Sequence, residues 1–112
     1  MKHDSMRKLW IDDFREPPDR EWLWAKSSAE ALMMYAEHKI DYIAFDYDLG
    51  GPDTSMPVLL KIERDAQAGR RAPPRFNAHT ANPVGRNHIE TIMNNAMEYW
   101  AAHEAVRIRS RL

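Results

Sequence analysis

Three short apolar runs and one segment after a Pro pair stand out along the chain. The three runs are rich in Trp, Ile, Phe or Tyr, and the fourth segment contains Phe. The runs are bordered by charged residues, and the fourth segment follows Pro74. Short runs with such borders predict β-strands. The predicted strands cover residues 8–11, 22–25, 42–45 and 75–79.

Two segments between these strands carry apolar residues at helical spacing. In the first, Ser27 and Glu30 form a capping-box sequence that predicts a helix start, and about three helical turns follow. Its apolar stripe is predicted to be Ala29, Leu32, Met33 and Ala36. The second helix is predicted over about 55–68, with a stop at Gly69. It is expected to bury Val58, Leu59 and Ile62.

The last helix is predicted to start at Asn82, because Asn is a favoured N-cap residue and Pro83 suits the first helical position. Its buried stripe is predicted to be Ile89, Ile92, Met93, Ala96 and Trp100. The end of the chain, 106–112, alternates apolar and basic residues. The sequence leaves open whether this end forms an edge strand, a frayed helix end or a docking segment.

Strands that alternate with helices predict an α/β fold with a mostly parallel sheet and helices on both faces. The connection at 14–21 is short and contains Pro17 and Pro18, so the first crossover helix is expected to be shortened or missing. We expect a single domain over 1–112, with a core at about 7–102 and a basic tail at 103–112.

The composition excludes several classes of site. The 112 residues contain no Cys, which excludes disulfides, thiolate metal sites and thiol nucleophiles and fits a cytoplasmic location. No apolar stretch reaches the ~20 residues that cross a bilayer. The net charge is −1, but the acidic residues concentrate in 1–56 and the basic residues in 57–112. This asymmetry fits a cation site near an anion-facing surface, or simple charge balance on a solvated surface.

Acidic residues directly follow two of the predicted strands. Asp12 and Asp13 follow the first strand, and Asp46 and Asp48 follow the third. Ligands of open α/β sheets bind at the carboxyl ends of the strands, so these acids are expected to share one rim. Crowded carboxylates favour a cation, and oxygen ligands without Cys favour Mg²⁺, Mn²⁺ or Ca²⁺ over zinc. Because His79 also suits Mn²⁺ or zinc, the expected ion is Mg²⁺ or Mn²⁺, with zinc as an alternative. We expect the metal at Asp12, Asp13 and Asp46; the alternative is that some of these acids only cap loops.

The start of the last helix adds groups that suit a phosphate. A helix N-terminus offers free N–H groups and a partial positive charge. Thr80 and Asn82 lie at this junction, Gly85 permits close approach, and Arg86 can add a bidentate contact. An Asn-Pro pair is commonly only a helix cap, so this interpretation depends on the neighbouring His79 and Thr80.

Two kinds of residue have competing interpretations. His79 is either a general acid or base or a metal ligand, or a hydrogen-bonded histidine at a strand end, and its polar neighbours favour a function. Trp22 and Trp24 are core candidates first; the alternative is that one of them lines a nucleotide pocket.

The acidic pair, the segment 46–50 (DYDLG) and Thr80 resemble the receiver domains of response regulators. In receivers the acidic pair binds Mg²⁺, the Asp after strand three accepts phosphate, and the Thr or Ser after strand four contacts the phosphoryl group. The resemblance therefore implies these roles for Asp12 and Asp13, for Asp46 and for Thr80.

A closer resemblance is to a receiver-like family, the cyclic-phosphate-processing receiver domains. It is carried by 9–15 (LWIDDFR) with Pro17, by 45–50 (FDYDLG) and by 79–86 (HTANPVGR), and spans roughly 7–100. It implies action on cyclic nucleotides or RNA ends and adds Arg15 to the expected phosphate-binding residues. The chain departs from ordinary receivers in its first crossover and in having no Lys-Pro pair after a fifth strand, which favours hydrolysis over signalling.

The leading hypothesis is therefore a metal-dependent phosphoesterase acting on a cyclic phosphate or related phosphodiester. Asp46 would help to bind the metal, His79 would protonate the leaving oxygen, and Asp48 would orient it or act as a base. The alternative is a non-catalytic or atypical receiver-like module that senses phosphate or a phosphorylated partner. The sequence leaves open whether the chain is an enzyme and whether it forms a homodimer; no membrane partner is expected.

Overall fold

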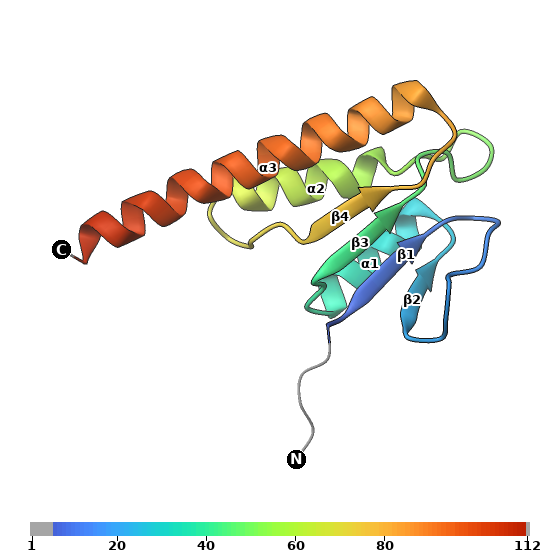
Figure 1. Ribbon diagram of the computed structural model, residues 1–112, viewed down its shortest axis with the longest axis horizontal. Coiled ribbons are helices and arrows are strands. Elements are labelled where there is room, and N and C mark those ends of the chain that lie inside the picture. Colours follow the sequence, from blue (N-terminus) through green and yellow to red (C-terminus); the bar gives the residue numbers. More distant parts are fainter. Residues whose placement is uncertain (1–5, 112) are drawn as a thin grey trace, which may run out of the picture.

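A computed structural model describes residues 6–111 and shows one four-stranded sheet with three helices (Figure 1). The strands are β1 (Lys8–Ile11), β2 (Trp22–Ala25), β3 (Tyr42–Phe45) and β4 (Arg75–Ala78). The helices are α1 (Ser28–Glu37), α2 (Met56–Gln67) and α3 (Pro83–Ser110). The expected single domain also includes 1–5 and 112, which lie outside the described residues.

The sheet has the order β2-β1-β3-β4, and every neighbouring pair is parallel. This order equals the first four strands of a flavodoxin-like sheet, so the predicted receiver-like α/β fold is confirmed. The predicted loss of the first crossover helix is also confirmed, because residues 12–21 connect β1 to its parallel neighbour β2 without a helix.

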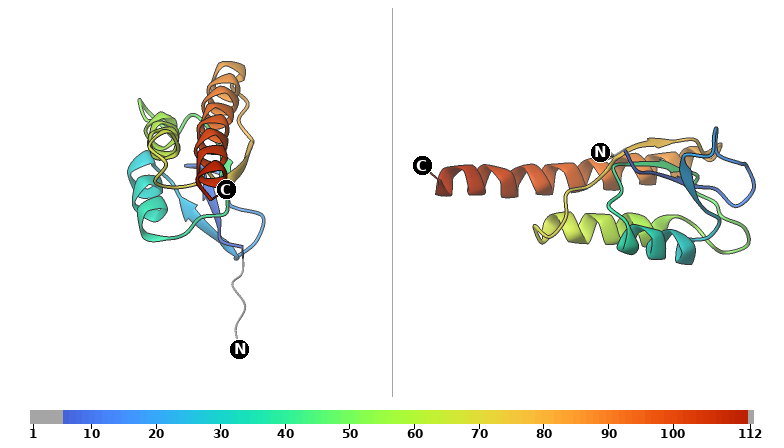
Figure 2. Two further views of the ribbon diagram at one scale, coloured as in Figure 1. Left: turned by 90° about the vertical axis from the view of Figure 1, so that its left-hand side faces the viewer. Right: turned by 90° about the horizontal axis from the view of Figure 1, so that it is seen from below.

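The helices lie over one face of the sheet and not over both, as Figure 2 shows from two sides. The connections β2-α1-β3 and β3-α2-β4 both run in the same direction across the sheet. Right-handed crossovers in one direction place their helices on one face. The β1–β2 connection runs the other way and would cover the second face, but it contains no helix. The prediction of helices on both faces was therefore wrong for the described residues.

One apolar core lies between this face and the helices. Leu9, Ile11, Ile43 and Phe45 of the sheet are fully buried against the helices. The predicted core residues of α2 are confirmed as Val58, Leu59 and Ile62, and those of α3 as Ile89, Met93 and Ala96, with Ile92 and Trp100 partly buried.

The ends of the helices follow the predicted signals. In α1 the Glu30 N–H donates to Ser27 Oγ at 3.1 Å, and the Lys26 N–H donates to Glu30 Oε1 at 2.8 Å. Gly69 follows α2 with a φ of +71°, a conformation that suits Gly. Both predicted boundaries are confirmed.

The third helix settles the open question about the end of the chain. α3 continues to Ser110, so the segment from 106 is helical and not an edge strand. It extends past the sheet (Figure 1), and Arg107 Nη2 donates to the Gly69 carbonyl at 3.0 Å. None of the described helices, α3 included, is both long and apolar enough to span a bilayer.

Candidate functional site

The candidate site is one row of residues just past the ends of three strands. The backbone ladder continues beyond the strands, since the Asp46 N–H donates to the Ile11 carbonyl and the His79 N–H donates to the Phe45 carbonyl, each at 2.8 Å. The last residues of β1, β3 and β4 are in register. Asp12, Asp46 and His79 directly follow them and therefore lie side by side.

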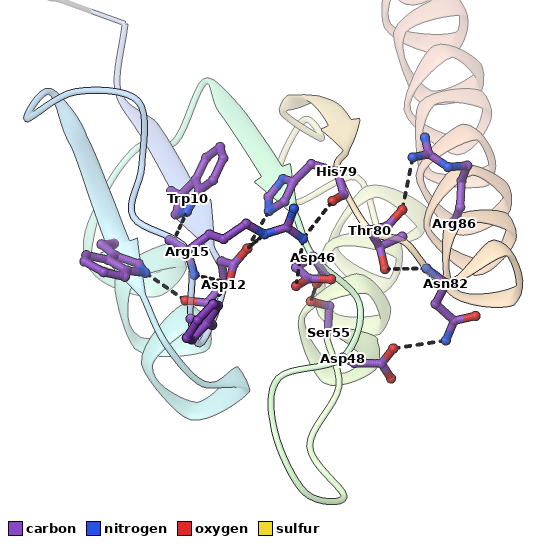
Figure 3. A network of polar contacts seen from close by, with 12 residues as sticks. Trp10, Asp12, Arg15, Asp46, Asp48, Ser55, His79, Thr80, Asn82 and Arg86 are labelled. Atoms are coloured by element: carbon purple, nitrogen blue, oxygen red, sulfur yellow. Dashed lines mark hydrogen bonds and ion pairs between the residues drawn. The ribbon is translucent and has the colours of Figure 1, made fainter.

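The side chains of this row converge, as Figure 3 shows. Asp12, Asp46 and His79 each place one ligand atom within 4.8 Å of the others. His79 Nε2 lies 3.2 Å from Asp12 Oδ2. We call these three residues the carboxylate–histidine group. The parallel topology creates it from residues that are up to 67 positions apart in the sequence.

Asp12 is fully buried and fixed by its own loop. Its Oδ1 accepts the backbone N–H groups of Phe14 and Arg15, each at 2.8 Å, and Trp24 Nε1 donates to its carbonyl at 2.7 Å. Burial alone would raise the pKa of Asp12, but these backbone hydrogen bonds and the charges of His79 and Arg15 lower it. Asp12 is therefore held in place and charged at neutral pH.

Arg15 brings a positive charge to the two carboxylates. The turn that Asp12 caps sends the Arg15 side chain back over the site, where Nε lies 3.4 Å from Asp12 Oδ2 and Nη2 lies 3.8 Å from Asp46 Oδ2. Nη2 also donates to the His79 carbonyl at 3.4 Å. The side chain is 55% exposed, so it can turn toward a bound anion.

Asp46 sits in a less favourable environment than Asp12. The pKa of Asp46 is raised, mainly by burial and also by the nearby charge of Asp12. A hydrogen bond from the Thr80 side chain opposes this shift in part. Ser55 Oγ donates to the Asp46 carbonyl and fixes the backbone. Two close carboxylates with one partly exposed Arg leave excess negative charge, which a divalent cation would relieve.

His79 is held flat against Trp10. Their ring centroids are 4.2 Å apart with an interplanar angle of 6°. Burial lowers the pKa of His79, although the charges of Asp12 and Asp46 oppose this. His79 Nδ1 is buried without a partner among the described residues, and Nε2 faces the Asp12 carboxylate, which can only accept, so Nε2 donates to Asp12 Oδ2. His79 is therefore positioned to exchange a proton at Nε2.

The other two acids lie outside the group. Asp13 is exposed and lies beside Gly50. A β-carbon at Gly50 would be 3.0 Å from Asp13 Oδ2. Asp48 is exposed and accepts a hydrogen bond from Asn82 Nδ2 at 3.1 Å. The strands β1 and β3 end at residues 11 and 45, so the alternation of side chains along a strand does not set the direction of Asp13 and Asp48. The carboxylate beside His79 is therefore Asp12 and not Asp48.

The start of α3 reaches the group through Thr80. Asn82 is the N-cap, as predicted, and its Oδ1 accepts the N–H groups of Val84 at 3.0 Å and Gly85 at 3.2 Å. These two donors are therefore already used. Arg86 Nη2 donates to the Thr80 carbonyl at 3.1 Å, and the buried Thr80 contacts Asp46.

Gly85 has a packing role that the sequence did not reveal. A β-carbon at this position would lie 2.5 Å from Tyr47 Cγ, closer than atoms can approach. The absence of a side chain lets α3 pack against Tyr47, whose ring also stacks on His88 at 5.6 Å. Close helix approach, and not access for an anion, explains this Gly.

Gly85→Ala is therefore expected to lower the free energy of unfolding by about 1–2 kcal/mol in urea titrations. Overpacking costs roughly 1–3 kcal/mol, and the better helix propensity of Ala returns up to about 1 kcal/mol. The same substitution in a Tyr47→Ala background should be neutral or stabilising, because the clash is gone. Stabilisation by Gly85→Ala in the wild-type background would disprove this packing role.

Two contributors to the site were missed from the sequence. Trp10 supports His79, and its position two residues before Asp12 on the same face of β1 was an available signal. Ser55 anchors Asp46 from nine residues away, where the loop returns to the sheet. No local pattern marks Ser55, because the path of that loop is a tertiary property.

Comparison with known proteins gives one match. The sequence model of the family described as "Cyclic-phosphate processing Receiver domain" matches residues 7–95. The matched range includes Asp12, Asp46, His79 and the start of α3. The searches of curated proteins and of solved structures gave no match.

Proposed function

This chain belongs to the cyclic-phosphate processing receiver domain family, and on this basis we propose that it is a metal-dependent phosphoesterase that hydrolyses a cyclic phosphate of a nucleotide or RNA end. The observation that carries the proposal is the convergence of Asp12, Asp46 and His79 within 4.8 Å at the strand ends. We further propose that it acts in the cytoplasm, which agrees with the absence of Cys.

The two carboxylates of the group fit a hard divalent cation. Asp12 is charged and rigid, and the raised pKa of Asp46 reflects its burial and the nearby charge of Asp12. Carboxylate oxygens are the ligands that Mg²⁺ and Mn²⁺ favour. When bound, such an ion polarises a phosphate oxygen and lowers the pKa of water. Asp13, exposed at the rim, is proposed to add a ligand only through water.

Arg15 and Thr80 are proposed to bind the phosphate. The Arg15 guanidinium already lies above both carboxylates and is half exposed, so it can turn to two phosphate oxygens. Thr80 contacts Asp46 with its side chain and is held from behind by Arg86. In this proposal Asn82 and Gly85 shape the start of α3, and Arg86 positions Thr80.

His79 is proposed to move the proton. In this proposal the bound substrate displaces Asp12 from Nε2, and the neutral ring then carries its hydrogen on Nδ1. Nε2 accepts a proton from the attacking water while the water oxygen bonds to phosphorus. The bond from phosphorus to the 2′ or 3′ oxygen then breaks, and the proton on Nε2 passes to that leaving oxygen. The lowered pKa of His79 favours the neutral ring that this step needs.

Turnover tests this proposal. The purified protein is expected to convert 2′,3′-cyclic nucleotides to phosphomonoesters in the presence of Mg²⁺ or Mn²⁺, as followed by chromatography. EDTA should stop the reaction and added metal should restore it, because without a cation the two carboxylates repel the anionic phosphate. If no cyclic nucleotide is hydrolysed with any of these metals, the proposal is wrong.

A second candidate is a receiver-like sensor, favoured by the contact of Thr80 with Asp46, which resembles the phosphoacceptor pair of receivers. Acetyl phosphate with Mg²⁺ would then add the mass of one phosphoryl group at Asp46. Tight binding of a cyclic nucleotide without product would also favour this alternative over an enzyme.

A further inference from the structure

The face of the sheet without helices carries an aromatic pocket. Alternate residues of the four strands point to this face, and together with the neighbouring loop they enclose about 310 Å³. This volume lies at the lower end of the range for small-ligand sites. We call it the open-face pocket; its main lining residues are Lys8, Trp10, Trp22, Tyr42, Arg75 and Asn77.

The pocket walls are aromatic rings in fixed positions. Trp22 meets Trp10 edge to face at 5.5 Å and Tyr42 edge to face at 6.0 Å. Ala44 also lines the pocket but is only 1% exposed, because the larger side chains around it cover it. Planar aromatic walls suit a flat, aromatic ligand.

The open-face pocket is continuous with the carboxylate–histidine group. Trp10 lines the pocket and also stacks on His79 at 4.2 Å. Asn77 lines the pocket on β4, two residues before His79 and on the same face. Two residues of a strand span about 7 Å, so pocket and group are neighbouring parts of one surface.

We propose that the open-face pocket holds the nucleobase of the substrate while the carboxylate–histidine group holds its cyclic phosphate. The inference rests on the proposed function for the phosphate end and adds where the base of that nucleotide binds. Aromatic side chains on an open sheet commonly stack bases. Asn77 can bond to a base edge, and the cations of Lys8 and Arg75 complement a nucleotide, which is anionic.

Adenosine, which has no phosphate, tests the pocket independently of hydrolysis. In NMR spectra of the full chain, adenosine should shift the indole signals of Trp10 and Trp22, while ribose should not. Tyr42→Leu should weaken this binding roughly 10-fold, because base stacking contributes about 1–3 kcal/mol. Should Tyr42→Leu fail to fold, Trp22→Leu on the edge strand β2 takes its place. Tyr99→Leu, at an exposed aromatic residue on α3, is the control and should bind adenosine like the wild type.

Other occupants of the face give different results. If a second copy of the chain covers it, sedimentation will show a dimer that adenosine neither binds nor dissociates, and the inference is overturned. It is equally overturned if adenosine shifts no indole signal or if Tyr42→Leu binds like the wild type. If adenosine binds but no cyclic phosphate is hydrolysed, the base pocket is supported and the proposed function is wrong. If a cyclic phosphate is hydrolysed but adenosine does not bind, only the base pocket is wrong.

A free cyclic nucleotide and the end of an RNA present the same base and cyclic phosphate. Comparing a 2′,3′-cyclic mononucleotide with a dinucleotide that ends in the same cyclic phosphate separates them. Tighter binding of the dinucleotide, lost in Arg75→Ala, would identify the RNA end. Equal binding would identify the mononucleotide.

Discussion

Asp46→Asn is expected to reduce hydrolysis of a 2′,3′-cyclic nucleotide by ~10³-fold or more. The substitution keeps the shape of the side chain but removes the charge of one of the two carboxylates proposed to bind the metal. Metal ions contribute several kcal/mol of transition-state stabilisation, and each 1.4 kcal/mol corresponds to tenfold in rate. The measurement is kcat/KM at saturating Mg²⁺.

The fold should survive this change. Asp46 is held through its backbone by Ile11 and Ser55, and neither contact uses the carboxylate. Its raised pKa shows that the fold does not favour the charged form of the carboxyl. Glu90→Gln, the same carboxylate-to-amide change on the exposed side of α3, should leave kcat/KM unchanged. Full activity of Asp46→Asn would remove Asp46 from the mechanism.

His79→Gln is expected to lower kcat by roughly 10²–10⁴-fold, the usual contribution of a general acid or base. Unlike Asp46→Asn, it should leave Mn²⁺ binding intact, because both carboxylates remain. Measuring kcat beside Mn²⁺ titration separates the two roles. His103→Gln, at the far half of α3, is the control. Loss of Mn²⁺ binding in His79→Gln would make His79 a ligand instead of a proton carrier.

The dependence of activity on pH should show the titration of His79. In the proposed mechanism neutral His79 is the active form, and burial lowers its pKa from the ordinary value of 6.5. The fall of activity at acidic pH, as the ring becomes protonated, should therefore have its midpoint below pH 6.5. The remaining activity of His79→Gln should lack this acidic limb. A limb above pH 6.5 in the wild type would contradict the lowered pKa.

Most of the fold could be predicted from the sequence because the local signals are strong. Short apolar runs gave all four strands to within one residue, and Ser27, Gly69 and Asn82 marked the ends of helices. The stripe of α1 was predicted only in part, because Leu32 packs against the core but Ala29, Met33 and Ala36 are exposed. The helix buries Ala31 and Tyr35 and exposes Met33, because the large ring of Tyr35 turns toward the core while the flexible Met33 tolerates solvent.

The site was predictable in part, for a physical reason. Residues that directly follow parallel strands must share an edge, so Asp12, Asp46 and His79 could be brought together from the sequence alone. Asp13 and Asp48 lie one or two residues further, where loops set the direction of each side chain. The second face of the sheet is open because the β1–β2 connection contains no helix, and that absence could be predicted. The pocket on this face depends on how the aromatic rings pack, which no local sequence pattern encodes.

The central claim is that Asp12 and Asp46 form one divalent-metal site beside His79. Anomalous diffraction from crystals soaked in MnCl₂ tests it most directly. A single strong peak within coordination distance of both carboxylates, with His79 Nε2 facing it, is the predicted result. A peak only at other acidic residues, with Arg15 still pairing with both aspartates, would contradict the claim.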